Sequence, residues 1–310
     1  MSGNHRPIRI GTRGSPLALV QARMVREALA TAHPDLRGAD DIQILPIKTT
    51  GDAVQDRKLM EIGGKGLFTK ELEEALFAGT IDLAVHSMKD MPAKPPVGLD
   101  IAALLPREDP RDAFISLNFK TLSDLPHGAI LGSSSVRRTA QALRIRPDLG
   151  TAPFRGNVQT RLKKLQDGIA HASFLAVAGL NRLNLADKIT SIMSMDDMLP
   201  SVAQGAIGIQ INARDDAMRK MIAPLNHEAT SIAVICERGF MGALDGSCRT
   251  PIAGHAIIEN NVLKFRGEAL TLDGKHVFTV SREGALSDGF KMGHDAGEDV
   301  KARGGKLIAY

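Results

Sequence analysis

The segment Leu83-Ala84-Val85-His86-Ser87-Met88-Lys89-Asp90-Met91-Pro92 decides which fold the sequence predicts. The run 81–85, apolar apart from Asp82, is typical of a buried strand, and the Met-Pro pair ends regular structure. In α/β sheets, ligands bind beyond the carboxyl ends of the strands, which is where Lys89 and Asp90 lie. A cation beside a carboxylate there indicates an anionic substrate whose chemistry needs one carboxylate. An ordinary charge pair on a turn is the alternative.

The composition of the 310-residue chain is that of a globular protein with two or three domains. Apolar residues make up 43% and charged residues 24%, the ordinary balance of a soluble protein. No apolar run approaches the roughly 20 residues of a membrane span. Residues 1–7 lack the apolar core of a signal peptide. We therefore expect a cytoplasmic protein that has no membrane partner.

The supply of cysteine and aromatic residues argues against several functional classes. Cys236 and Cys248 cannot form a disulfide framework, neither belongs to a Cys-x-x-Cys pair, and we expect no metal site. With one Tyr and no Trp, the chain offers few platforms for base stacking, and its net charge of +4 is spread along the chain. Nucleic-acid binding, which would show strong salt dependence, is an alternative that the composition does not favour.

A strand, a hydroxyl-bearing turn and a helix follow one another at the N-terminus. Residues 8–11 form the expected strand, and Ser15 has the place of an N-cap for a helix that begins at Pro16. Because helix N-termini favour anions, Arg13 and Ser15 are candidate ligands of an anionic group. Simple capping explains Ser15 fully but leaves Arg13 unexplained.

The same arrangement returns further along the chain. A strand is expected at residues 129–132, and Ser133, Ser135, Arg137 and Arg138 follow it at the start of a helix. The serines offer donors and caps, and the arginines offer bidentate contacts to carboxylates. Cations at a helix N-terminus oppose its dipole, so surface arginines without a ligand are the less favoured interpretation.

Further polar residues follow strand ends or open helices. Residues 154–161 predict a turn into a helix that carries Arg155 and Arg161. Arg182 follows the buried strand expected at residues 173–177, and Gln204 lies in a glycine-rich return strand. These side chains extend the set of candidate anion ligands.

Residues 49–65 lack clear periodicity and lead into Gly63-Gly64-Lys65-Gly66. A loop of this length inside a compact domain is usually a lid or is disordered. The glycines fail the Walker pattern, because Gly66 stands where Ser or Thr is required. We expect a mobile cover whose base carries Lys65 as a further cation for carboxylates.

The C-terminal part changes character and predicts a small α+β domain. A long helix is expected at residues 227–244 and a final helix from Phe290. Between them lie three alternating strands of an antiparallel sheet, at residues 252–258, 262–270 and 277–282.

The two cysteines differ in their surroundings. Cys236 lies within the long helix and is expected to be inert. Cys248 lies in a turn beside Arg249, whose charge favours the reactive thiolate. A loop cysteine without any function is the alternative for Cys248.

Seven motifs along the chain carry a resemblance to one family. They are Arg-x-Ser-Pro-Leu-Ala-Leu from Arg13, Gly-Gly-Lys-Gly-Leu-Phe from Gly63, His-Ser-Met-Lys-Asp from His86, Arg-Glu-Asp-Pro-Arg-Asp-Ala from Arg107, Arg-Gly-Asn-Val from Arg155, Leu-Ala-Val-Ala-Gly-Leu from Leu175 and Gln-Gly-Ala from Gln204. Over essentially the whole chain, the sequence closely resembles the porphobilinogen deaminase (hydroxymethylbilane synthase) family. Ser133 and Ser247 stand where many relatives have Thr and Gly, which are small departures.

The resemblance implies an α/β fold. Two doubly wound lobes resembling type II periplasmic binding proteins enclose a cleft, and a small C-terminal α+β domain with a three-stranded antiparallel sheet follows. The domains expected on this basis are residues 1–105 with 200–223, residues 106–199, and residues 224–310. A monomer is expected.

The resemblance also implies an activity. Four porphobilinogen molecules are condensed head to tail, with loss of ammonia at each step, onto a dipyrromethane cofactor, and water releases hydroxymethylbilane. The cofactor is joined by a thioether to the cysteine that matches Cys248. The catalytic carboxylate matches Asp90, which at the pyrrole N–H can stabilise the cationic azafulvene left by ammonia. The runner-up is a non-catalytic two-lobed carboxylate- or anion-binding protein, which needs the arginines but neither Asp90 nor Cys248.

Porphobilinogen carries acetate and propionate, so the other candidate residues are expected to bind carboxylates of substrate or cofactor. They are Arg13, Ser15, Lys65, Ser87, Lys89, Ser133, Ser135, Arg137, Arg138, Arg155, Gly156, Asn157, Arg161, Arg182 and Gln204.

Overall fold

The computed structural model describes residues 6–36, 38, 40–53, 66, 68–245 and 250–308. The chain forms two compact units. Unit 1 comprises Met1–Val54, Gly64–Arg107 and Ala206–Ser231, and most of unit 2 lies in Glu108–Gly205 and Ile232–Tyr310.

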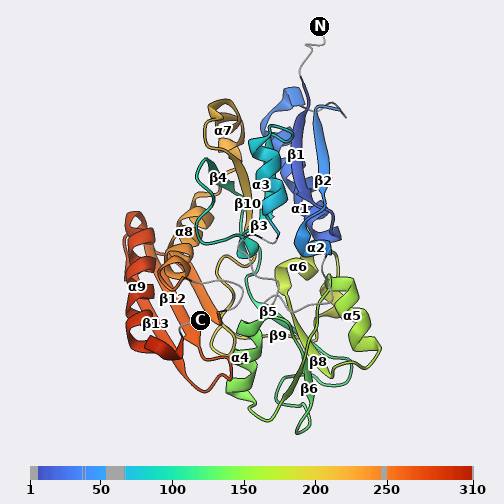
Figure 1. The fold of residues 1–310 in the computed structure, drawn as a ribbon, viewed down its shortest axis with the longest axis vertical. Coiled ribbons are helices and arrows are strands. Elements are labelled where there is room, and N and C mark those ends of the chain that lie inside the picture. The colour runs from blue at the N-terminus through green and yellow to red at the C-terminus, as the bar shows by residue number, and fades with distance from the viewer. Residues whose placement is uncertain are drawn as a thin grey trace. The chain divides into compact units, whose positions relative to one another are not determined.

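Unit 1 is built on one mixed sheet, which we call the lobe 1 sheet, with strand order β2-β1-β3-β10-β4 (Figure 1). β1 pairs in parallel with β2 and β3, whereas β10 runs antiparallel to β3 and β4. The strands are β1 (Ile8–Arg13), β2 (Ile42–Ile47), β3 (Leu83–Ser87), β4 (Leu99–Leu104) and β10 (Ile207–Asn212).

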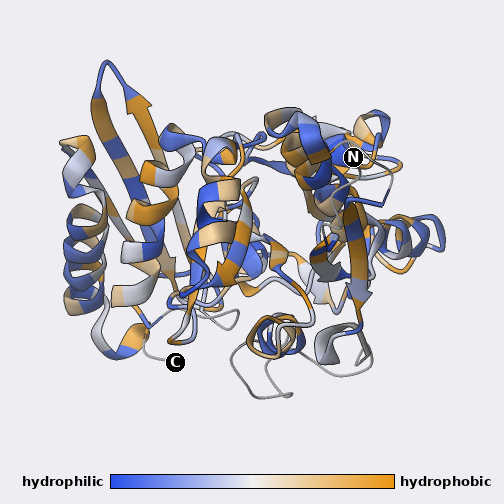
Figure 2. Cartoon of the chain, turned by 90° about the horizontal axis from the view of Figure 1, so that it is seen from above, coloured by the Kyte–Doolittle hydropathy of each residue, from blue (hydrophilic) through white to orange (hydrophobic). Residues whose placement is uncertain are grey.

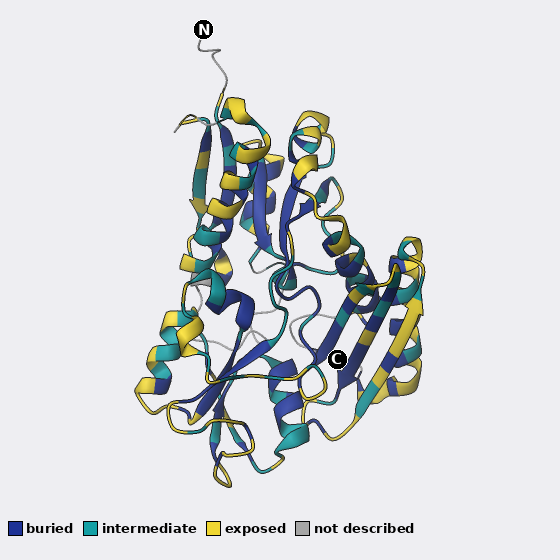
Figure 3. Ribbon diagram, turned by 180° about the vertical axis from the view of Figure 1, so that it is seen from behind, coloured by how far each residue is buried: buried dark blue, intermediate teal, exposed yellow. Residues whose placement is uncertain are grey.

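Helices cover both faces of the lobe 1 sheet. Along β3, Leu83 and Val85 join a buried cluster with α1 (Pro16–Ala32) and α7 (Asp216–Ile222). Ala84 joins a cluster with α3 (Lys70–Phe77) on the other face. This alternation buries both faces of the central strands, which Figure 3 shows in dark blue. Short segments α2 (Thr50–Ala53), η1 (Pro34–Leu36), η2 (Met88–Asp90) and η4 (Ala223–Leu225) complete the unit.

Unit 2 contains a second mixed sheet with the same plan, which we call the lobe 2 sheet. Its order is β7-β6-β8-β5-β9; β6 pairs in parallel with β7 and β8, and β5 runs antiparallel to β8 and β9. Each lobe therefore has one strand that runs antiparallel to both of its neighbours: β10 lies between β3 and β4, and β5 lies between β8 and β9. The strands are β5 (Asp112–Ile115), β6 (Ile130–Gly132), β7 (Gly150–Ala152), β8 (Ala172–Ala176) and β9 (Ser191–Ile192).

The faces of the lobe 2 sheet are also buried alternately. Phe114 packs in a cluster with α4 (Val136–Ile145), and its ring lies 5.8 Å from that of Phe174. Ala113 and Ile115 face the cluster of α5 (Val158–Gln166) and α6 (Val177–Arg182). A short helix η3 (Ala186–Lys188) leads into β9.

The rest of unit 2 is the C-terminal sheet, an antiparallel sheet of β11 (Ile252–Glu259), β12 (Val262–Leu270) and β13 (Val277–Gly284). Apolar and polar bands alternate along these strands (Figure 2), as expected for a sheet with one packed face. α8 (Glu228–Ala243) and α9 (Gly289–Gly304) accompany it, with η5 (Leu286–Asp288) and η6 (Gly305–Leu307). A Cβ on Gly293 would lie 1.9 Å from the Cys236 carbonyl oxygen, so glycine allows the two helices this close approach.

The predicted fold class is confirmed, since two doubly wound sheets precede a three-stranded antiparallel sheet. The predicted strand at residues 262–270 has the observed bounds. Two edge strands, β7 and β9, were not predicted, because they are short and carry few apolar residues. The segment expected as a loop from residue 49 begins with one helical turn, and its residues 54–65 lie outside the described residues. The exact domain boundaries stay a prediction.

Candidate functional site

In unit 1, the carboxyl ends of β1 and β3 bring two predicted residues together. Arg13 is the last residue of β1, and Asp90 closes the helical turn η2 that follows β3. Since β1 and β3 are parallel neighbours, both residues lie at the same edge of the sheet. An Arg13 nitrogen, Nη1, lies 3.7 Å from Asp90 Oδ2.

The ion pair of Arg13 and Asp90 remains accessible. The Asp90 side chain is 36% exposed and that of Arg13 22%. Phe68 lies against the same guanidinium, whose central carbon is 4.2 Å from the ring centroid, a cation–π distance. The arrangement therefore holds a positioned carboxylate that can still reach a ligand.

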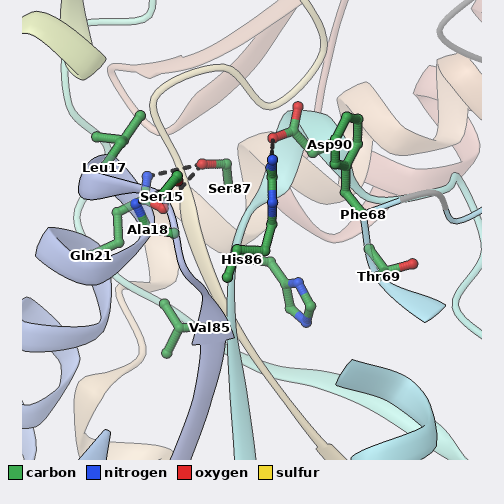
Figure 4. A pocket seen from close by; sticks show the side chains of 11 residues that line it. Ser15, Leu17, Ala18, Gln21, Phe68, Thr69, Val85, His86, Ser87 and Asp90 are labelled. Atoms are coloured by element: carbon green, nitrogen blue, oxygen red, sulfur yellow. Dashed lines mark hydrogen bonds and ion pairs between the residues drawn. The ribbon is translucent and has the colours of Figure 1, made fainter. Parts of the chain in front are cut away.

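Ser15, Gln21 and Ser87 line the same pocket as Arg13 and Asp90 (Figure 4). Ser15 caps α1 and accepts a hydrogen bond from Ala18 N at 3.3 Å, as predicted. Ser87 lies 2.9 Å from Gln21 Nε2, so the buried Gln21 side chain fixes the serine hydroxyl. Lys89 occupies the middle of η2, next to Asp90.

Buried polar side chains lie on the α3 face of the sheet, beside this pocket. His86 Nε2 lies 2.9 Å from Gln210 Oε1. Burial lowers the pKa of His86 to about 4; the hydrogen bond with Gln210 opposes the shift, and the charge of Arg13 adds to it. Burial raises the pKa of Glu73 on α3, against hydrogen bonds from Gln210 and Thr69. The imidazole is therefore neutral at physiological pH.

In unit 2, predicted residues gather around a carboxylate that was not predicted as a site residue. Asp112, the fully buried first residue of β5, accepts hydrogen bonds from Arg138 Nε (3.1 Å), Arg138 Nη2 (2.6 Å) and Gln204 Nε2 (3.0 Å). Arg137 Nη1 lies 2.8 Å from its other oxygen. Burial alone would raise the pKa of Asp112, but the charges of Arg137 and Arg138 hold it well below its usual range.

The two arginines of this cluster differ in how their donors are used. Arg138 donates hydrogen bonds from Nε and Nη2 to Asp112 and from Nη1 to the Phe174 carbonyl oxygen (2.9 Å). Every partner of Arg137 among the described residues is on Nη1, and its Nε is buried without a partner there. The Nε–Nη2 edge of Arg137, which suits a carboxylate, thus has no hydrogen-bond acceptor among the described residues. It is buried with the rest of the side chain, and we call it the open edge because its donors are unused. Carboxylate binding by Arg138 would require it to give up existing bonds, so that role stays a prediction.

The predicted turn into α5 is held mainly by its own residues. Asn157 caps the helix by accepting from Thr160 N at 2.9 Å, and Arg161 Nε donates to the Gly156 carbonyl oxygen at 2.9 Å. Gly156 has φ +117°, a backbone conformation that favours glycine. Arg155 is half-buried, and its carbonyl oxygen accepts from Lys164 Nζ at 3.1 Å.

The remaining predicted ligands of unit 2 make protein contacts. Ser135 caps α4 by accepting from Arg138 N at 3.4 Å, and Ser133 Oγ donates to the Ser135 carbonyl oxygen at 3.2 Å. Arg182 Nη2 donates to the Gly205 carbonyl oxygen at 2.7 Å, and burial lowers the pKa of this guanidinium.

Two predicted residues, Lys65 and Cys248, lie outside the described residues. Cys236 is buried in α8, and burial together with the charge of Glu237 raises the pKa of its thiol to about 12, which accords with the expected inert residue. Among the helices of the described ranges, none is both long and apolar enough to cross a membrane.

Sequence reasoning missed Asp112, Gln21, Phe68 and His86 as parts of these sites. A signal for Asp112 was present, because an acidic residue directly opens the apolar strand 113–115. Gln21 gave no such signal, since a glutamine within an amphipathic helix is ordinary.

Comparison with known families gives two matches that together cover most of the chain. Residues 8–220 match the family described as porphobilinogen deaminase, dipyromethane cofactor binding domain. Residues 231–302 match the porphobilinogen deaminase C-terminal domain.

Two relatives illustrate the similarity to whole proteins. The porphobilinogen deaminase of Paracoccus denitrificans is 53% identical over 297 residues, which cover 96% of this chain and 94% of the relative. The chloroplastic porphobilinogen deaminase of Oryza sativa subsp. japonica is 52% identical over 301 residues, which cover 96% of this chain and 84% of the relative.

Two solved structures illustrate the more distant similarities. The periplasmic aliphatic sulphonate binding protein SsuA from Escherichia coli has 14% identity and a TM-score of 0.41, with 77% of this chain and 71% of that chain covered. The BvgS VFT2 domain from Bordetella pertussis (the F375E/Q461E double mutant) has 13% identity and a TM-score of 0.43, with 72% and 87% covered.

Proposed function

Since the chain belongs to the porphobilinogen deaminase family, we propose that Asp90 and Arg13 form the catalytic pair of its deaminase reaction. The protein is a transferase of tetrapyrrole synthesis that uses a dipyrromethane cofactor. It joins four porphobilinogen molecules head to tail with loss of ammonia, and water releases hydroxymethylbilane.

In each unit, taken by itself, the donors of the described residues suit carboxylates. Unit 1 has Arg13 and two serine hydroxyls at a pocket, and unit 2 has the open Nε–Nη2 edge of Arg137. When bound, the cofactor supplies the pyrrole carbon onto which the first substrate is joined. We assign its thioether attachment to Cys248. The contrast between the two cysteines supports this assignment, because the sequence predicts Cys248 in a turn beside Arg249, whereas Cys236 is buried and its thiol has a raised pKa.

Asp90 has the properties that the chemistry demands. Ammonia loss leaves positive charge on the substrate pyrrole, and coupling then removes a proton from a ring carbon. A fixed carboxylate near the pyrrole N–H can stabilise the cation and receive the proton in turn. Arg13 orients the carboxylate, and Lys89 lies beside it to receive a substrate carboxylate.

The observation that carries this proposal is the accessible 3.7 Å pair of Arg13 and Asp90 at the strand ends of the lobe 1 sheet. A non-catalytic anion-binding protein would use the arginine but has no need of an accessible carboxylate beside it. About 50% identity to deaminases over 96% of the chain also disfavours that alternative.

The test compares Asp90→Asn with Asp90→Glu by turnover and by intact-protein mass. Asparagine should lower turnover by about a hundredfold or more, because it cannot offer the charge. Glutamate keeps the charge but is displaced by about 1 Å, so it should retain some activity and accumulate enzyme with extra pyrroles. If asparagine performs as well as glutamate, charge is not the contribution of Asp90.

The same mass measurement tests the cofactor attachment. Cys248→Ala should carry no covalent pyrrole adduct, whereas Cys236→Ala should keep it, and an adduct on the Cys248 variant would refute the assignment. We further propose a monomeric, cytoplasmic enzyme, which gel filtration and cell fractionation would test.

A further inference from the structure

A buried carboxylate of the C-terminal sheet, Glu268, is linked through Gln141 to Arg137, one of the residues around Asp112 in lobe 2. Glu268 lies on the central strand β12, opposite Ala253 and Thr279, and is 5% exposed. It is far from Arg137 in sequence, and the established reaction assigns it no role.

The link begins at Arg137, whose Nη1 has three acceptors. They are Asp112 Oδ2 at 2.8 Å, Gln141 Oε1 at 2.9 Å and the Leu199 carbonyl oxygen at 2.9 Å. Because all three lie at one nitrogen, they set the rotation of the planar guanidinium. That rotation decides where the open Nε–Nη2 edge points.

Gln141 is the member of this set whose orientation can reverse. Its Oε1 faces Arg137, and its Nε2 donates to Leu199 O at 2.9 Å and to Glu268 Oε1 at 2.6 Å. A flipped amide would turn its NH2 group toward a guanidinium and its oxygen toward a carboxylate and a carbonyl. Both contacts would be repulsive, so the charge of Glu268 helps to fix the orientation that Arg137 requires.

We propose that Glu268 is a positioning residue that, through Gln141, aims the open edge of Arg137 at a carboxylate of the substrate or cofactor. The proposal rests on the proposed function, because the ligand is the one assigned there. It makes the C-terminal sheet a support of the carboxylate site in lobe 2, within the same unit.

Arg144 provides a matched control, because Glu268 has two separate branches. Its Oε2 accepts a hydrogen bond from Arg144 Nη1 at 3.1 Å, whereas its Oε1 accepts one from Gln141 Nε2. Glu268→Gln and Arg144→Gln both abolish the ion pair, and Arg144→Gln also loses the hydrogen bonds from Arg144 Nη2 to the carbonyl oxygens of Asp196 and Asp197, so the control should cost at least as much stability. Only the first weakens the branch that leads to Arg137.

The experiment measures the KM for porphobilinogen, kcat and the thermal midpoint of wild type and variants. Glu268→Gln should raise KM about fivefold, as expected when one hydrogen bond in a charged network weakens, with kcat within about twofold. Arg144→Gln should leave KM unchanged. Gln141→Met should match Glu268→Gln, and the double variant should add nothing further, since both act on one path.

A second readout does not depend on turnover. The Nε–Hε NMR signal of Arg137, assigned by its loss in Arg137→Lys, should exchange faster with water in Glu268→Gln and should not change in Arg144→Gln. Equal KM and equal exchange in the two glutamine variants would overturn the proposal. A wild type without any turnover would refute the proposed function instead, and the exchange comparison would still decide the role of Glu268.

Discussion

Lobe 1 and lobe 2 share one strand order, yet their arginines have opposite surroundings. In lobe 1, Arg13 precedes the helix cap Ser15 and forms an accessible pair with Asp90. In lobe 2, Arg137 and Arg138 follow the cap Ser135 and are buried, at 4% and 6% exposure. An arginine before the cap lies at the outer edge, whereas one in the first helical turn points back toward the sheet.

The first residue of the antiparallel strand explains the rest of the difference. Ile207 begins β10 opposite Ser87, the last residue of β3, and Asp112 begins β5 opposite Ala176, the last residue of β8. Equivalent positions thus carry an isoleucine in lobe 1 and a carboxylate in lobe 2. The lobe 2 carboxylate neutralises arginines within the fold, and the lobe 1 carboxylate, carried on η2, remains available for chemistry.

The largest expected effect tests this division directly. Asp112→Asn leaves two buried guanidinium groups without their counter-ion and should lower the free energy of unfolding by about 3–5 kcal/mol. Asp90→Asn should change it by no more than about 0.5 kcal/mol, because its pair is accessible to solvent. Urea unfolding of both variants measures the contrast. Similar losses in both would mean that the lobe 1 pair is also structural.

A pH titration of stability sharpens the comparison next. The folded-state pKa of His86 is about 4, below the 6.5 of the unfolded chain. Between these values only the unfolded state binds the proton, so stability falls as pH decreases from 6.5 to 4, by up to about 3 kcal/mol. The pKa of Asp112 is also lowered, but its contribution is constant above the unfolded value and is lost only in stronger acid.

His86→Gln should therefore flatten the stability profile between pH 6.5 and 4, measured by urea unfolding. Glu73 acts in the opposite direction on the same face, since its raised pKa makes stability fall as pH rises through its titration. The comparison with wild type cancels its contribution. The exposed His127→Gln is the control, and an unchanged slope in His86→Gln would show that lobe 1 does not cause the acid sensitivity.

The sequence predicted the repeated strand–cap–helix plan because capping and apolar periodicity are local. Ser15 and Ser135 are N-caps, as their positions indicated, and Asn157 caps the helix of the predicted turn-to-helix entry. The sequence also placed Arg13 and Asp90 each after a strand, but it did not predict the ion pair between them. Both inferences needed only neighbouring residues and the parallel-sheet rule.

The partners of the lobe 2 arginines could not be predicted in the same way. Asp112 lies 25 residues before Arg137 (137 − 112) on another strand, and only the register of β5 with β8 brings it to that edge. The Glu268–Gln141 contact depends on how the C-terminal sheet packs on α4. Long-range pairings of single polar residues leave no periodic pattern in the sequence. The sequence therefore predicted Arg137 and Arg138 only as ligands of carboxylates, whereas the fold also binds them to the buried Asp112.

The smallest expected effect concerns the ring beside Arg13. Phe68 holds the guanidinium through a cation–π contact at 4.2 Å, whereas ion pairs and hydrogen bonds hold the lobe 2 arginines. Such a contact contributes about 0.5–1 kcal/mol at an accessible site, so Phe68→Leu should raise the KM for porphobilinogen roughly two- to fivefold, with kcat nearly unchanged. Phe77→Leu, at a 51% exposed position on α3, is the control and should have no effect. Because Asp90 also contacts Arg13, a fall in kcat without any change in KM would mean that the ring supports the catalytic carboxylate instead of the binding of substrate.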